Sequence, residues 1–225
     1  MVEPGAAVVV AGSPPRFVGR GGDKLSAALA EFGVGVTGAA VLDAGSSTGG
    51  FTDCLLQAGA SSVVAVDVGR GQLHARLLAD PRVRSLEQTN LRDLSLMLAG
   101  GSPFPVIVAD LSFISLRTVA PVLAGELAAP EADLVVLVKP QFEAGRAEVS
   151  RGRGVVRDPK TWLACLDGVA SALEAAGAAI MGAMVSPLTG ADGNVEFFLH
   201  ARAHHTTSAP RPDLNETVAR ASLGR

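Results

Sequence analysis

The sequence predicts a doubly wound α/β fold with a seven-stranded, mostly parallel sheet. Short β-branched runs alternate with helical patterns after residue 38, as they do in parallel sheets covered by helices. A glycine-rich turn follows the first of these runs, and the last two runs are close enough in sequence to form a hairpin. One soluble domain is expected, because a chain of 225 residues can bury roughly 70% of its unfolded surface in a single core.

Seven segments have the length and β-branched composition of strands. Five of them precede the longest helical pattern, and the last two follow it. The predicted strands are Ala40–Leu42, Ser62–Val66, Val83–Leu86, Val106–Ala109, Leu134–Val138, Ala178–Val185 and Glu196–Ala201.

The clearest predicted helix is Pro159–Ala176. Asp158 is placed to cap it, proline suits its first turn, and Gly177 ends it. A shorter helix begins at Asp23 and ends at Gly33, because apolar residues recur between them at helical spacing. Further helices are predicted over Gly50–Ala58, Gln72–Ala79, Leu91–Leu98 and Leu116–Leu123.

The two ends of the chain differ in composition from the region between them. Residues 1–22 end in "SPPRFVGRGG", whose prolines and glycines do not sustain regular structure, so we expect a linker or the remnant of an RNA-binding domain. Residues 203–225 are polar and are expected to form a tail with one weak helix near Leu214–Ser222. The predicted domain therefore spans residues 23–202.

Composition argues against several classes of protein. A net charge of -3 argues against non-specific coating of nucleic acid, and no apolar run approaches the roughly 20 residues of a membrane span. Cys54 and Cys165 lie in apolar, helical stretches, and no signal peptide opens the chain, so a reduced, cytoplasmic setting is expected. No metal site is predicted, because four histidines lack ligand spacing relative to the cysteines: His74, His200, His204 and His205.

The strongest local signal is "VLDAGSSTGGFTDCLL" at residues 41–56: a strand, an acidic residue, a glycine-rich turn and a helix. It is not the dinucleotide fingerprint G-x-G-x-x-G, since Gly45 is followed by two serines. Its form, Asp43-x-Gly45-x-x-x-Gly49 followed by Gly50, resembles the first motif of class I methyltransferases, which bind S-adenosylmethionine (SAM). Asp67 ends the second strand, where a carboxylate can accept both hydroxyls of a ribose. The alternative is a tight turn and a solvated aspartate.

Four more ionisable residues stand at element ends. Asp110 and Lys139 follow the fourth and fifth strands directly, at the sheet edge where open α/β folds bind ligands. A lysine after five apolar residues is poorly solvated unless it faces a cleft, which makes it a candidate base; a lysine that merely extends to solvent is the alternative. Glu196 opens the last strand, and Lys24 opens the upstream helix, so both can converge on the same edge.

From about Phe17 to Arg202 the chain resembles the catalytic domain of the TlyA family, 2′-O-methyltransferases of ribosomal RNA related to FtsJ-type enzymes. The resemblance rests on the segments above together with "RGGDKL", "ADLSFISL", "LVKPQFE", "GVVRDP" and "GNVEFF", in that order. It implies a Rossmann-like class I SAM-dependent methyltransferase fold. It also implies a catalytic tetrad at Lys24, Asp110, Lys139 and Glu196, and SAM bound by Asp43, Gly45, Gly49, Gly50 and Asp67.

The chain departs from the family pattern in three places. Family members usually begin with a small RNA-binding domain, and only "EPGAAVVVAGSPPRF" resembles its end and the linker. Arg70 and Ala75 stand where the family often has aromatic residues. Because the chain has no tyrosine and only 4% aromatic residues, stacking platforms for RNA bases are hard to build.

Basic residues gather where RNA would need to pass. Arg16 and Arg20 precede Lys24, and each could neutralise a phosphate. The alternative is a solvated loop, since "GRAEVSRGRG" is also linker composition. Residues 139–160 contain three acidic and six basic residues. The basic ones are Lys139, Arg146, Arg151, Arg153, Arg157 and Lys160.

The expected function is transfer of a methyl group from SAM to a ribose 2′-hydroxyl of RNA, with ribosomal RNA and ribosomal subunits as partners. Lys139 would accept or relay the hydroxyl proton, Asp110 would hold Lys139, and Lys24 with Glu196 would orient the ribose. Two other interpretations stay open. One is a small-molecule SAM enzyme, either a methyltransferase or a SAM cyclase such as an azetidine-2-carboxylate synthase; the other is a non-catalytic RNA-binding assembly factor.

Overall fold

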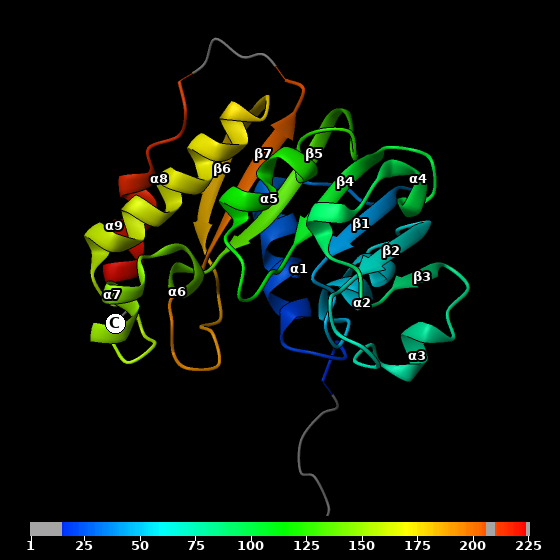
Figure 1. Cartoon of the computed structure of the whole chain (residues 1–225), viewed down its shortest axis with the longest axis horizontal. Helices are drawn as coiled ribbons and strands as arrows, with labels where there is room; N and C mark the ends of the chain where they lie inside the picture. Colours follow the sequence, from blue (N-terminus) through cyan, green and yellow to red (C-terminus); the bar gives the residue numbers. More distant parts are fainter. Residues whose placement is uncertain (1–14, 206–209, 224–225) are drawn as a thin grey trace, which may run out of the picture.

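The computed structural model describes residues 15–205 and 210–223. Its centre is one seven-stranded sheet in the order β3-β2-β1-β4-β5-β7-β6 (Figure 1). Strands β1 to β5 pair in parallel, whereas β7 is antiparallel to both of its neighbours. This confirms the predicted fold class and the closing hairpin. The strands are β1 (Ala40–Ala44), β2 (Ser62–Val66), β3 (Val83–Leu86), β4 (Phe104–Ala109), β5 (Ala128–Val138), β6 (Ala178–Val185) and β7 (Phe197–Ala203).

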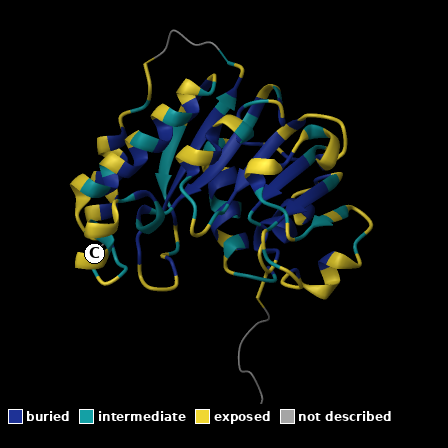
Figure 2. Cartoon of the chain, in the orientation of Figure 1, coloured by how far each residue is buried: buried dark blue, intermediate teal, exposed yellow. Residues whose placement is uncertain are grey.

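Helices cover both faces of the sheet. On one face α1 (Gly21–Phe32) packs against α2 (Gly50–Gln57). On the other, α8 (Pro159–Ala175) lies between α5 (Leu116–Leu123) and α9 (Leu214–Leu223). Burial follows this layering: the strands are buried, and the outward sides of the helices are exposed (Figure 2).

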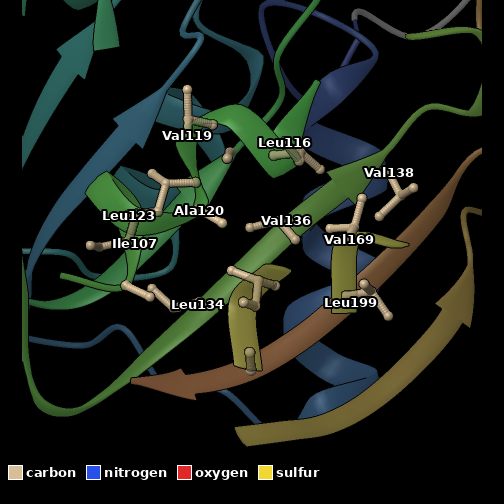
Figure 3. Packing of buried hydrophobic residues seen from close by; sticks show 14 of the residues in the cluster. Ile107, Leu116, Val119, Ala120, Leu123, Leu134, Val136, Val138, Val169 and Leu199 are labelled. Carbon is tan, nitrogen blue, oxygen red and sulfur yellow. The ribbon is translucent and has the colours of Figure 1, made fainter. Parts of the chain in front are cut away.

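The central strand β5 explains why its sequence is a continuous apolar run. Successive side chains of a strand point to opposite faces, and both faces of this sheet are covered. Leu134 and Val136 therefore join the cluster beneath α5 and α8, while Val135 and Leu137 join the cluster beneath α1 and α2. Figure 3 shows the first of these clusters, where side chains of β4, β5 and β7 meet α5 and α8.

Two predicted helices are shorter than expected, because polar side chains cap the backbone in their interiors. The helix predicted over Gln72–Ala79 is only α3 (Ala75–Leu78), with the His74 side chain accepting from the Arg76 amide. The helix predicted over Leu91–Leu98 is split into a 3-10 turn, η1 (Leu91–Asp93), and α4 (Leu96–Ala99). The Asn90 and Ser95 side chains each accept a backbone N–H and start a separate turn.

The region after Lys139 also differs from the prediction, which had no regular element there. The structure forms two short helices, α6 (Pro140–Glu143) and α7 (Arg146–Arg151). Proline at the first position of α6 suits a helix start, because its missing N–H would have no partner there.

Both predicted domain boundaries need correction. Phe17, expected in the linker, is buried against Gly22, so the packed unit includes this segment. At the other end, α9 is no free tail, because Leu214, Val218 and Ala221 are buried in the core. Residues 1–14 of the predicted linker lie outside the described residues. Over the described ranges, no helix is both long and apolar enough to cross a membrane.

Candidate active site

The turn between β1 and α2 is built on two glycines with positive φ. Gly45 has φ +87°, and a Cβ there would lie 2.5 Å from the carbonyl oxygen of Asp110. Gly49 has φ +98°, and a Cβ there would lie 2.2 Å from a methyl of Leu77. Any larger residue would be strained and would push β4 or α3 away. The turn can therefore bring backbone N–H groups close to a ligand.

Asp67, at the end of β2, is held in place by backbone groups. Its Oδ2 accepts the Ser47 N–H at 2.8 Å, and its Oδ1 accepts the Gly69 N–H at 2.7 Å. Because a carboxylate has about four acceptor positions, each oxygen keeps one for a ligand. This geometry suits a pair of ribose hydroxyls.

A cavity of about 860 Å³ opens at the carboxyl edge of the sheet. Its size lies within the usual range of small-molecule sites, about 300–1,000 Å³. Polar groups of the turn form one side, and apolar side chains from the loops after β3 and β4 form the other. The wall includes Gly45, Ser47, Asp67, Gly69, Leu91, Asp110, Leu111, Phe113 and Ile114.

Asp43 lies beneath the turn rather than in the cavity wall. It is 0% exposed, its Oδ2 accepts the Thr52 hydroxyl at 2.6 Å, and its Oδ1 has no hydrogen-bond partner among the described residues. Burial raises the pKa of Asp43 to about 7, against the lowering effect of the Thr52 hydrogen bond; the neighbouring Asp110 adds to the rise. Asp43 and Gly49 were expected to bind the cofactor, but neither lines the cavity, because both shape the turn from below.

The sequence-predicted tetrad forms two ion pairs. Lys139 Nζ lies 2.5 Å from Asp110 Oδ1 and donates to the Ser112 hydroxyl at 3.1 Å. Lys24 Nζ donates to Glu196 Oε2 at 2.5 Å, and this second pair is buried.

The two ion pairs are brought together by the reversed strand. In the antiparallel ladder Val138 of β5 pairs with Phe197 of β7, so Lys139 and Glu196 occupy the next facing positions. A strand that began at the opposite edge would carry Glu196 away from Lys139. The convergence expected from the sequence is therefore present.

A smaller hollow of about 110 Å³ adjoins the main cavity. Asp110 and Gly45 line both spaces, and Gly50 lines only the smaller one. The rest of its wall comes from the turn between β1 and α2, from Phe51 of α2, and from Gly19, Arg20 and Gly21 at the start of α1. Asp110 therefore stands between two spaces at the sheet edge, one large and one small.

Glu143 is a positioning residue that the sequence alone did not reveal. It is buried, its Oε2 accepts the Ser115 hydroxyl at 2.5 Å, and its Oε1 accepts the Leu116 N–H at 2.7 Å. Burial raises the pKa of Glu143, opposed by these hydrogen bonds and by Arg117. Because Glu143 ends α6 and Ser115 caps α5, this contact fastens the loop after Lys139 to the loop after Asp110.

Phe113 is the second residue that the sequence did not single out. It is 91% exposed, has φ +65°, lines the cavity and lies 5.1 Å from the ring of Phe142. An aromatic residue held in this rare conformation at a site is typical of ligand contact. Phe113, in the loop after β4, and Phe142, in α6, thus form an aromatic pair beside the cavity, which the low aromatic content of the sequence did not suggest.

Comparison with known proteins places the chain in a family. The profile of the FtsJ-like methyltransferases matches residues 17–203. The 16S/23S rRNA (cytidine-2′-O)-methyltransferase TlyA of Mycobacterium tuberculosis is 47% identical over 216 residues, which cover 96% of this chain and 80% of that protein. The candidate rRNA methyltransferase YqxC of Bacillus subtilis is 49% identical over 86% of this chain and 68% of its own length.

A solved structure agrees with the sequence relatives. The candidate hemolysin from Lactococcus lactis superposes with a TM-score of 0.87 at 39% identity, covering 92% of this chain and 99% of that one. Fold, site and relatives point the same way: the chain belongs to the FtsJ-like methyltransferase family.

Proposed function

We propose that the protein transfers the methyl group of SAM to a ribose 2′-hydroxyl of ribosomal RNA, with a cytidine as the target nucleoside. The observation that carries this proposal is the pair of ion pairs, Lys139–Asp110 and Lys24–Glu196, at the carboxyl edge of the sheet, where Asp110 lines the cavity. The nucleoside and the RNA class follow from the names of the relatives.

The residues of the cavity fit SAM. Asp67 keeps free acceptor positions for ribose hydroxyls, the turn at Gly45 offers a close backbone, and Leu111 and Ile114 provide apolar wall for a purine. SAM supplies a methyl group on a sulfonium, whose leaving group departs neutral, so no metal is required. Asp43 lies below this site and supports it from the interior.

Lys139 is the group that handles the proton. Once its ammonium has released a proton to solvent, the neutral amine accepts the proton of the ribose 2′-hydroxyl as the oxygen attacks the methyl group, and the 2.5 Å contact with Asp110 fixes this amine at the sheet edge. Asp110 balances the positive charge that Lys139 gains. A positioned acid–base group of this kind contributes about 10²–10⁴-fold to a rate.

The other two members of the tetrad orient the acceptor. The Lys24–Glu196 pair is rigid because it is buried and its atoms come from a helix start and a strand start. Phe113, exposed on the cavity rim, is placed to stack on the base of the target nucleotide. Positioning of this kind lowers a barrier by removing freedom of motion before the reaction.

Mass spectrometry of the products tests the proposal. The protein is incubated with SAM, with and without ribosomal subunits lacking the modification, and Lys139→Ala serves as the control. We expect S-adenosylhomocysteine only with RNA, together with a 2′-O-methylated nucleoside after RNA digestion. Methylthioadenosine formed from SAM alone would indicate a SAM cyclase, and S-adenosylhomocysteine formed only with a metabolite extract would indicate a small-molecule methyltransferase. SAM binding without any product would indicate an assembly factor.

A further inference from the structure

A second groove lies on the flank of the sheet formed by β6 and β7, away from the SAM cavity. Its volume is about 470 Å³, and it runs between the loop that follows β6 and the end of α9. Two arginines line it, Arg157 from the loop before α8 and Arg220 from α9. The rest of the wall mixes apolar and polar residues: Val185, Ser186, Pro187, Thr189, Gly193, Val195 and Ala221.

The two arginines have no protein partner among residues 15–205 and 210–223. Both are exposed, and within the described residues neither forms an ion pair or a side-chain hydrogen bond. Other arginines of the chain do find acids: Arg151 pairs with Glu148, and Arg211 with Asp167. Arg157 and Arg220 are therefore free to bind an anion. The protein as a whole has a net charge of -3, so the two arginines give this groove a charge opposite in sign to that of the whole chain.

The backbone that carries Arg157 is fixed by a buried amide. Asn194 is 1% exposed, its Oδ1 accepts the Val156 N–H at 2.9 Å, and its Nδ2 donates to the Gly154 carbonyl at 2.9 Å. The indole of Trp162 donates to the Val156 carbonyl at 3.0 Å. Arg157 thus follows a segment whose backbone is held by hydrogen bonds, so the point from which its side chain extends is fixed.

The backbone that carries Arg220 is fixed by packing. Val218 and Ala221 are buried on either side of it in the core, which turns Arg220 outward. Arg157, in the loop between α7 and α8, lines the same groove as Arg220 and Ala221 of α9. Two cations separated by 63 positions in the chain therefore share one groove.

Backbone hydrogen bonds connect the segment that lines the groove to the residues just before β7. The Ser186 N–H donates to the carbonyl of Glu196 at 2.9 Å, and Gly190 donates to the carbonyl of Asn194 at 2.8 Å. Glu196 belongs to the tetrad. The backbone that lines the groove at Ser186 is therefore hydrogen-bonded directly to the backbone of Glu196.

We propose that Arg157 and Arg220 bind the phosphodiester backbone of the RNA substrate beyond the target nucleotide, an assignment that rests on the proposed function. Guanidinium groups match phosphate oxygens with paired hydrogen bonds, and Thr189 adds an exposed hydroxyl. Single-anion metabolites would leave most of such a groove empty. The proposal extends the basic stretch after Lys139 to an arginine of the last helix.

The test compares Arg157→Ala, Arg220→Ala and the double variant with Arg84→Ala. Arg84 is also exposed and unpaired within the described residues, but it lies on β3 at the opposite edge of the sheet. Each groove variant should raise KM for the RNA about tenfold and reduce the slope of log affinity against log salt by about 1. The double variant should reduce the slope by about 2, while SAM affinity and the unfolding midpoint stay at wild-type values.

Two outcomes would overturn the proposal. One is a change of KM and salt slope no larger than that of Arg84→Ala. The other is competition by polyglutamate as strong as that by RNA of equal charge, which would indicate a site for acidic proteins. RNA binding by fluorescence anisotropy separates this question from catalysis. If the wild type binds RNA through both arginines but forms no S-adenosylhomocysteine, the groove stands and the proposed function fails.

Discussion

Asp43 shows how one buried carboxyl can make stability depend on pH. Its pKa of about 7 in the folded chain lies above the ordinary value of 3.8, so between these values the native state holds a proton that the unfolded state has lost. The contribution of Asp43 to stability is therefore greatest below pH 4, falls as the pH rises towards 7, and is constant above it.

Asp43→Asn should remove this dependence. An amide can still accept the Thr52 hydroxyl but cannot ionise, so relative to the wild type the variant should gain stability as the pH rises from 4 to 7, on the order of a few kcal/mol. Urea unfolding of both proteins at intervals from pH 4 to 8 measures it. A constant difference across this range would mean that Asp43 stays ionised in the folded chain.

Asp67→Ala should weaken SAM binding by about 1.5–3 kcal/mol, the scale of hydrogen bonds to a charged group. The loss follows from the free acceptor positions that the Ser47 and Gly69 amides leave on the carboxylate. Calorimetric titration measures the affinity, and Asp80→Ala, at a carboxylate outside the cavity wall, is the control. Equal affinity for the Asp67 variant and the wild type would remove this residue from the site.

Lys139→Ala should lower single-turnover methyl transfer by about 10²–10⁴-fold, because one acid–base group is lost, and leave SAM affinity near wild type. The variant Lys139→Arg distinguishes the proton-transfer role of Lys139 from the role of its positive charge. A guanidinium can still face Asp110 but does not release its proton, so this variant should also be slow. Full activity of the arginine variant would show that Lys139 supplies charge only.

At the scale of elements, α9 shows that a segment of polar composition can still pack against the core. Three apolar side chains, four and three residues apart, are enough to attach it to α8 and β6.

Leu214→Ala should reduce the free energy of unfolding by about 2–4 kcal/mol, since Leu214 is only 4% exposed. Leu223, on the same helix but 86% exposed, is the control, and its alanine variant should change stability by less than about 0.5 kcal/mol. Similar effects at both positions would contradict the packing described for α9.

The elements that the sequence predicts well are those whose signals are local. β-Branched runs located all seven strands, and strand ends placed Asp110 and Lys139 at one edge, because parallel strands end together. Burial of Asp43, the anchor at Glu143 and the groove at Arg220 depend on contacts between distant segments. Single-sequence patterns carry no information about such contacts, so these features required the structure.

At the scale of the whole molecule, the SAM cavity is built from the same strands as the hydrophobic core. Its wall uses the ends of β1, β2 and β4, which are central strands and open only when the domain unfolds. S-adenosylhomocysteine at 100 times its Kd should therefore add about 2.7 kcal/mol to the free energy of unfolding. Thermal unfolding with and without it measures the gain, and Asp67→Ala should reduce it at the same concentration. A midpoint that does not move would place the ligand outside this cavity.

The pairing of Lys24 with Glu196 joins residues 172 positions apart. A ribosome releases the chain from its N-terminus, so the segment that lines the SAM cavity, residues 45–118, emerges long before β7 does. A partly synthesised chain can present the cavity walls but not the tetrad, because Glu196 arrives with the last strand of the sheet. With the roles proposed for the tetrad, we therefore expect methyl transfer only after β7 has been synthesised and has paired with β5.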